Sequence, residues 1–431
     1  MAENRADEIL ALLHDSAFTA LRHESSRDAL PFKVFQQMPM PEGYTADETW
    51  AILTAIRRQT AIVLPWRSYH VRENTIWYSN TQTMATRLAQ LDARCKSGSP
   101  LDQVISERTS RYLLVQPLVE ELLAAAWRDG IHTRYEDVRA LLLRGRPPAS
   151  PAERVLLNSQ ELLYDLDRYA HRQITMGLIE EMYERVSEGV GPLDAVPYER
   201  DLVVVGSPYS DPDIAMGTIC RMARGENTDP FIHPLFIATS MAHIFWDFRP
   251  LPACNALVEL QIRRLFLRRA GYPVLVYLPF AAIWRAWEDG TIHPPQVVSR
   301  PLELDPDCGE GMDITTGQSV FLQLLMDELA RFEVLVAESK EHDDRVSAIL
   351  RHHPHINDRQ RAILDEAIRR PDREYRIDAH RKMHGIAYAT ARQDLLGLES
   401  AGFLQRETHG KSFVFRPASD LKSRIEGHSE G

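Results

Sequence analysis

Apolar residues recur at intervals of three and four positions through the middle of the chain. This periodicity predicts amphipathic helices at residues 112–127, 135–143, 151–169, 177–186 and 212–223. Short loops rich in Pro and Gly separate these helices. A further amphipathic helix is predicted at 316–341, and the charged segment 340–355 indicates a hinge. Residues 1–95 mix helical segments with stretches that contain Pro and aromatic residues. We therefore expect a mainly α-helical body.

The pattern changes after the predicted hinge. Asn357 is an N-cap candidate for a helix whose apolar face is Ile363, Leu364 and Ala367. Two more helical segments follow, and Gly402 is expected to end the second of them. Two runs with alternating polarity then flank a turn, which predicts a β-hairpin with strands at 404–407 and 412–416. The C-terminal part is therefore expected to combine three helices with a hairpin.

Residues 390–398 of this part read Thr-Ala-Arg-Gln-Asp-Leu-Leu-Gly-Leu. With the hairpin behind it, this segment resembles the winged helix-turn-helix of transcription regulators. The resemblance implies that the second helix of the turn enters the major groove of DNA while the wing reaches phosphates. It assigns the groove to Tyr388, Thr390, Arg392 and Gln393, and the backbone contacts to Arg406, His409 and Lys411. The alternative is a module that contacts only proteins.

The segment 248–257 reads Phe-Arg-Pro-Leu-Pro-Ala-Cys-Asn-Ala-Leu. Together with the helical segments on either side of it, it resembles the Fic (Fido-fold) adenylyltransferases. That family reads His-Pro-Phe-x-(Asp/Glu)-Gly-Asn-Gly-(Arg/Lys)-x-x-Arg at this place. Pro250 and Asn255 match the motif. The other motif positions differ, because the family's His, acid, two glycines and two arginines correspond to Arg249, Ala253, Cys254, Ala256, Leu257 and Leu260.

These replacements remove the chemistry that the resemblance implies. Arg249 stays protonated, so it cannot take a proton from an attacking hydroxyl as the family's histidine does. Ala253 offers no oxygen to a divalent cation. The side chains at the two glycine positions crowd the approach of phosphate to the following helix, and the two leucines cannot neutralise its charge. We expect a pseudoenzyme without a catalytic residue, a metal or a cofactor.

The segment 125–130 resembles the inhibitory motif of the Fic family, (Ser/Thr)-x-x-x-Glu-(Gly/Asn). Ala125 stands in place of the hydroxyl residue, Asp129 in place of the glutamate, and Gly130 matches. In the family the glutamate pairs with a motif arginine, whose position here is Leu260. The alternative interpretation is an ordinary helix C-terminus that ends at Gly130.

Composition and charge indicate the class of protein and the type of partner. The chain has 431 residues, of which 44% are hydrophobic, which is typical of a globular protein with two or three domains. Its formal net charge is −11, but residues 354–424 hold 14 Lys and Arg against 10 Asp and Glu, a balance of +4. A mildly basic end on an acidic body indicates a partner that is nucleic acid.

The cysteines and the apolar runs bear on the cellular compartment and on membrane contact. Cys95, Cys220, Cys254 and Cys308 have no metal-binding spacing, which predicts reduced thiols in a cytoplasmic protein. The longest apolar run, 270–284, contains two prolines and is too short to span a membrane. Four arginines at helical spacing are predicted to form a solvated face with a few ion pairs: Arg263, Arg264, Arg268 and Arg269.

The sequence thus predicts an N-terminal extension (1–95), a Fido-like helical domain (96–345) and a winged helix-turn-helix domain (354–420). The leading hypothesis is a catalytically inactive Fic-like protein that binds double-stranded DNA as a regulator, with a possible homodimer and no membrane contact. One alternative is a protein adenylyltransferase or another nucleotide-dependent transferase with an altered site. It would use ATP and magnesium, with Arg249 on phosphate and Asn255 on the backbone or on phosphate. The other alternative is a protein-interaction scaffold.

Overall fold

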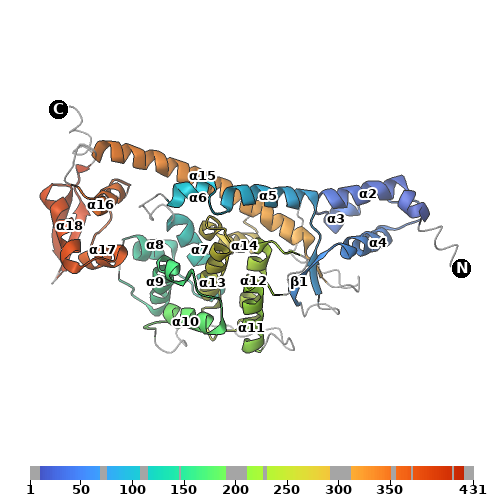
Figure 1. Ribbon diagram of the computed structural model, residues 1–431, viewed down its shortest axis with the longest axis horizontal. Coiled ribbons are helices and arrows are strands. Elements are labelled where there is room, and N and C mark those ends of the chain that lie inside the picture. The colour runs from blue at the N-terminus through green and yellow to red at the C-terminus, as the bar shows by residue number, and fades with distance from the viewer. Residues whose placement is uncertain are drawn as a thin grey trace.

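The computed structural model describes residues 10–67, 75–106, 115–144, 147–190, 211–226, 231–291, 312–350, 356–369, 372–409 and 412–421. This part of the chain is mainly helical and contains two small sheets. Buried apolar side chains form three separate clusters, one near the N-terminus, a large one in the body and one near the C-terminus. Figure 1 shows the helices that contribute to these clusters arranged along the long axis of the molecule. Among the described helices, none combines the length and apolar character that a membrane span requires.

The N-terminal cluster lies among α2 (Ser16–Arg27), α3 (Phe32–Phe35) and α4 (Ala46–Gln59). The rings of Phe32, Phe35 and Trp50 contact one another at its centre. A small sheet follows, in which β1 (Ile62–Arg67) pairs antiparallel with β2 (Thr75–Tyr78), and β2 pairs parallel with β3 (Met312–Asp313). This sheet joins the N-terminal part to the start of the long helix α15 (Thr315–Leu350).

The body is built on α13 (Asn255–Arg269), which contacts α7 (Val115–Arg128), α9 (Pro151–Tyr164), α10 (Met176–Val186) and α12 (Pro234–Phe248), with further helices packed outside these. The others are α5 (Gln82–Cys95), α6 (Pro100–Ser106), α8 (Tyr135–Arg144), α11 (Pro212–Ala223) and α14 (Phe280–Glu288). Short 3-10 turns lie at η2 (Leu166–Tyr169) and η6 (Leu275–Tyr277). The helix predicted at 151–169 therefore ends earlier than expected. The helix predicted at 316–341 instead continues to Leu350, so the hinge expected from residue 340 is helical at its start.

Helix α13 is buried on all sides, since every residue from Asn255 to Leu267 is inaccessible or nearly so. The interpretation of its arginines as a solvated face is wrong for Arg263 and Arg264, which are 0% and 1% exposed. Arg263 donates to Glu121 of α7 at 2.5 Å and to Glu259 at 2.6 Å. The second oxygen of Glu121 accepts the N–H groups of Ala281 and Ala282, which open α14. One carboxylate thus joins α7, α13 and α14.

The C-terminal part contains α16 (Asp358–Arg369), α17 (Ile377–His384), α18 (Tyr388–Ser400) and a hairpin of β4 (Leu404–His409) and β5 (Ser412–Pro417). Asn357 caps α16 as predicted, accepting the N–H of Gln360 at 3.0 Å. The predicted apolar face of α16 is buried in the C-terminal cluster. Gly402 follows α18 with φ of 78°, the left-handed conformation that favours glycine.

We predict that Glu121→Ala lowers the free energy of unfolding by about 3–5 kcal/mol, because it leaves a buried guanidinium short of a counter-ion. It also removes the acceptor for the first N–H groups of α14. The control is Arg134→Ala, which removes an ion pair whose arginine side chain is 85% exposed and should cost less than about 1 kcal/mol. Urea unfolding followed by tryptophan fluorescence measures both. Equal effects of the two substitutions would contradict the prediction.

Candidate functional site

The motif-like segment forms a tight turn between α12 and α13. Two residues that are not glycine adopt left-handed backbone conformations at its ends, Arg249 with φ of 45° and Cys254 with φ of 56°. Such conformations cost about 1–3 kcal/mol each, so surrounding contacts must hold them. Cys254 lies at the first glycine position of the Fic motif. The backbone therefore has the shape that glycine would favour, although a thiol occupies the position.

Asn255 holds this turn from inside. Its side-chain oxygen accepts the N–H of Leu251 at 2.9 Å, and its amide nitrogen donates to the carbonyl oxygen of the same residue at 2.9 Å. The side chain is 2% exposed. Because both ends of the amide are engaged with the backbone, Asn255 acts here as a structural clamp. This geometry does not favour the hypothesis that Asn255 contacts a nucleotide.

Asp129 lies against the N-terminus of α13. Its two carboxylate oxygens accept the N–H groups of Ala256 and Leu257, each at 3.0 Å. These N–H groups open the helix and have no intrahelical acceptor, so a helix N-terminus attracts an anion. In this chain the anion is a side chain of the protein itself. The place where the Fic resemblance would put a phosphate is therefore filled by Asp129.

The charge of this carboxylate is set by opposing effects. Burial raises the pKa of Asp129 to about 7, although the two backbone hydrogen bonds and the nearby Arg249 lower it. The carboxylate thus changes its protonation near neutral pH. The same surroundings raise the pKa of the Cys254 thiol far above its usual range, mainly through burial. Cys254 is therefore a neutral, buried thiol.

The other side chains of the motif-like turn are also buried or half-buried. Pro250, Ala253, Ala256, Leu257 and Leu260 are all buried. Arg249 is half-buried at the end of α12. The geometry brings the two motif-like segments together, but by backbone N–H groups and a carboxylate rather than by an arginine. Arg249 and Ala253, at the positions that correspond to the family's base and acid, offer neither a base nor a metal ligand.

The segment that resembles the inhibitory motif, residues 125–130, lies at the C-terminus of α7. Helix α7 ends at Arg128, and Gly130 follows with φ of 74°, so this is a helix C-terminus of the ordinary kind. Ala125 is completely buried in the body. The turn at Gly130 also directs the Asp129 carboxylate onto α13.

A buried group at the other end of α12 has a structural role. The Nδ1 atom of His233 accepts the N–H of Leu235 at 3.1 Å and caps the helix. Its Nε2 lies 3.0 Å from Asp92, and the hydroxyl of Tyr272 donates to the same carboxylate oxygen at 2.6 Å. Burial lowers the pKa of His233. Because both ring nitrogens are engaged, His233 does not offer a free base.

The second candidate site lies on α18, at the far left in Figure 1. Tyr388, Arg392 and Gln393 are exposed, and Thr390 is half-buried. The opposite face contributes Ala391, Leu395 and Leu398 to the C-terminal core. The helix therefore has one packed face and one face with polar side chains that solvent reaches. The structure brings the predicted groove residues together at the start of this helix.

Asp394 fixes the position of α18. Its carboxylate accepts hydrogen bonds from Asn357 at 2.9 Å, from Arg359 at 2.7 and 3.1 Å, and pairs with His380 at 3.0 Å. Although burial raises the pKa of Asp394, these bonds outweigh it and lower the pKa to about 2. One carboxylate on α18 thus holds both α16 and α17. The sequence motif contained Asp394 but gave no sign of this role.

The wing residues are only partly described. Arg406 on β4 pairs with Glu399 at 3.1 Å, and its guanidinium lies 4.9 Å from the ring centre of Phe413. Its side chain is still 38% exposed. His409 ends β4, but its side chain falls outside the described residues, as does Lys411. Arg406 is therefore the one predicted backbone contact whose surroundings are known.

Comparison with known protein families gives no matching family, and comparison with curated proteins gives no match either. The geometry of the two candidate sites must therefore support any functional proposal.

We predict that Asp129→Asn removes a pH-dependent part of the stability. A carboxyl group whose pKa is raised to about 7 on folding binds more protons in the folded than in the unfolded state between about pH 4 and 7. Its contribution to the free energy of unfolding is therefore full at low pH and falls as pH rises through this range. The amide variant lacks this term.

The measurement is the difference in thermal midpoint between wild type and Asp129→Asn across pH 4.5 to 8. The difference should shift in favour of the variant as pH rises. Asp167→Asn, an exposed carboxylate, serves as the matched control because its side chain is 53% exposed. A difference that stays constant with pH would contradict the assignment.

Proposed function

We propose that this chain is a DNA-binding regulator whose Fic-like body does not transfer nucleotides. The observation that carries the proposal is α18, a helix whose buried face is fixed by Asp394 and whose exposed face presents Tyr388, Arg392 and Gln393. A recognition helix requires this combination, because base readout needs a rigid helix with polar side chains free to reach the groove.

The turn before α18 supports the same proposal. Helix α17 ends at His384, Gly385 takes φ of 62°, and α18 begins at Tyr388. Two helices joined by a short turn with a glycine are typical of helix-turn-helix units. The hairpin β4–β5 follows directly, and Tyr375 bridges to Phe415 of β5. Such a hairpin beside the second helix corresponds to a wing.

Charge supports a modest non-specific component of binding. The region 354–424 has a balance of +4 on a chain whose remainder carries −15. Each phosphate contact releases counter-ions and adds salt-dependent affinity. A single copy offers few such contacts, so we propose that two copies bind together to a site with dyad symmetry.

The occupied N-terminus of α13 supports the proposal that the body does not transfer nucleotides. The Asp129 carboxylate occupies the first N–H groups of α13, and its negative charge repels a phosphate at the same place. The positions of the family's base and acid are Arg249 and Ala253, which supply neither function. These features favour the pseudoenzyme hypothesis over a transferase with an altered site.

We predict that Arg392→Ala and Gln393→Ala each weaken binding to a selected DNA site by about 1–3 kcal/mol and relax specificity at one base pair. Fluorescence anisotropy on a duplex selected in vitro, and on its single-base variants, measures both effects. Lys411→Ala should instead weaken binding to all sequences and reduce its salt dependence.

The matched control is Arg168→Ala, which removes a 77% exposed arginine from the body and should leave DNA binding unchanged. If no sequence is enriched at low salt, and if the Arg392 and Lys411 variants retain DNA as wild type does, the module would be assigned to protein contacts.

We also expect no transfer of AMP to this chain or to proteins of a lysate when it is incubated with labelled ATP and magnesium. The reason is the missing base and metal ligand, together with the occupied helix N-terminus. Labelling that disappears in the Arg249→Ala variant would show that the transferase alternative is correct.

A further inference from the structure

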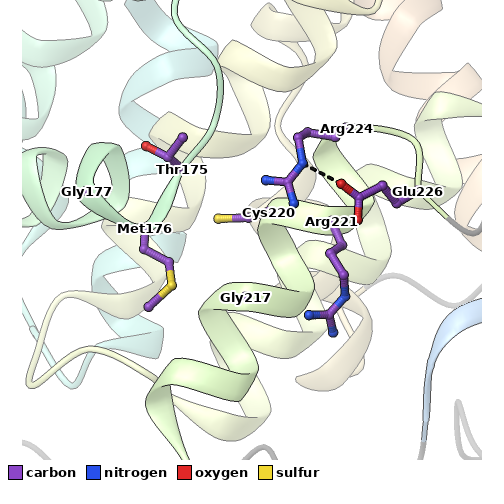
Figure 2. Close-up of a pocket in the computed structure, with 8 residues that line it drawn as sticks. All are labelled: Thr175, Met176, Gly177, Gly217, Cys220, Arg221, Arg224 and Glu226. Carbon is purple, nitrogen blue, oxygen red and sulfur yellow. Dashed lines mark hydrogen bonds and ion pairs between the residues drawn. The ribbon is translucent and has the colours of Figure 1, made fainter.

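A pocket of about 460 Å³, largely open to solvent, lies between the start of α10 and the end of α11 (Figure 2). This volume falls within the usual range for small-molecule sites. In Figure 2 the sulfur of Cys220 and the guanidinium of Arg224 extend from α11 toward α10, with Met176 on the other side. Neither the motif-like turn nor α18 contributes to the lining.

Two arginines give this cavity a positive charge. Arg221 donates to the Thr218 hydroxyl at 2.7 Å, and Arg224 pairs with Glu226 at 2.7 Å. A guanidinium has five N–H donors, so each of these single contacts leaves donors for a ligand. Two cations against one carboxylate leave one positive charge. This local positive charge contrasts with the net charge of −15 that the residues outside 354–424 carry in total.

The first residues of α10 line the same pocket. The Thr175 side chain caps the N–H of Leu178 at 3.2 Å. Within the described residues, the N–H groups of Met176 and Gly177 have no acceptor. A Cβ atom added at Gly177 would meet nothing within 4 Å, so a ligand can approach this backbone closely. The helix terminus therefore adds donors to a site that the cavity and the arginines already define.

The chemistry of the lining selects the ligand. Arginine forks match the geometry of phosphate oxygens, and helix N–H groups bind the same anion. Met176 and the buried Cys220 provide an apolar part that a bare ion would not use. Burial also raises the pKa of Cys220, so this thiol is neutral and does not repel an anion. We infer that the cavity binds a small phosphate monoester. This site goes beyond the proposed DNA-binding function and does not depend on it.

The test is isothermal titration of the full chain at low ionic strength with ribose 5-phosphate, inorganic phosphate and ribose. We expect saturable binding of ribose 5-phosphate, weaker binding of inorganic phosphate and none of ribose. Arg224→Ala should weaken binding about tenfold, because it removes a charge-assisted contact. Glu226→Gln should strengthen it, because Arg224 is then released from its carboxylate partner.

Two further variants make the result specific to this cavity. Gly177→Val places a branched side chain where the phosphate would lie and should abolish binding, whereas Arg168→Ala on the body should leave it unchanged. Circular dichroism checks that each variant is folded. The inference is overturned if ribose 5-phosphate does not bind up to about 10 mM, a very weak affinity. It is also overturned if Arg224→Ala and Gly177→Val bind as wild type does. DNA binding is measured separately, so either proposal can fail alone.

Discussion

The body of this protein depends on how a helix that is buried on every side obtains acceptors for its backbone. Water cannot reach the N-terminus of α13, and unpaired N–H groups there would cost free energy. Asp129 supplies the acceptor for Ala256 and Leu257. Glu121, two turns earlier on α7, pairs with Arg263 and caps α14. Two carboxylates, one on α7 and one directly after its end, therefore hold the centre of the body together, and the site suggested by the motif is a part of this internal framework.

Local sequence signals predicted much of the fold. Residues 212–223 form a helix as expected, Gly130 follows the end of α7, and the two strands of the hairpin after Gly402 pair as expected. These features depend on periodicity and on glycine conformations, which neighbouring residues determine. The failure at Arg263 and Arg264 has a different origin. Whether an arginine at helical spacing meets solvent depends on the helices packed around it, and its partner Glu121 lies 142 positions away.

The same distinction applies to the candidate sites. The exposed residues at the start of α18 were predicted because the whole unit lies within one short stretch of sequence. The position of Asp394 was visible, but its three partners on α16 and α17 became clear only once these helices were placed. The contact between Asp129 and α13 spans 127 positions, and the cavity between α10 and α11 results from packing alone. Helical periodicity encodes neither of them, and only the resemblance of residues 125–130 to the inhibitory motif related Asp129 to α13.

The length of α15 adds a mechanical consequence. This helix begins beside the small sheet, contacts the body through Phe321, Leu325 and Leu329, and continues to Leu350 with 36 residues in total. At 1.5 Å per residue it spans about 54 Å. A helix of this length transmits rotation, since each inserted or deleted residue turns everything beyond it by about 100°. Because α15 also contacts α16, a residue inserted or deleted between the body contacts and this contact would turn the face of α15 that meets α16 by about 100°.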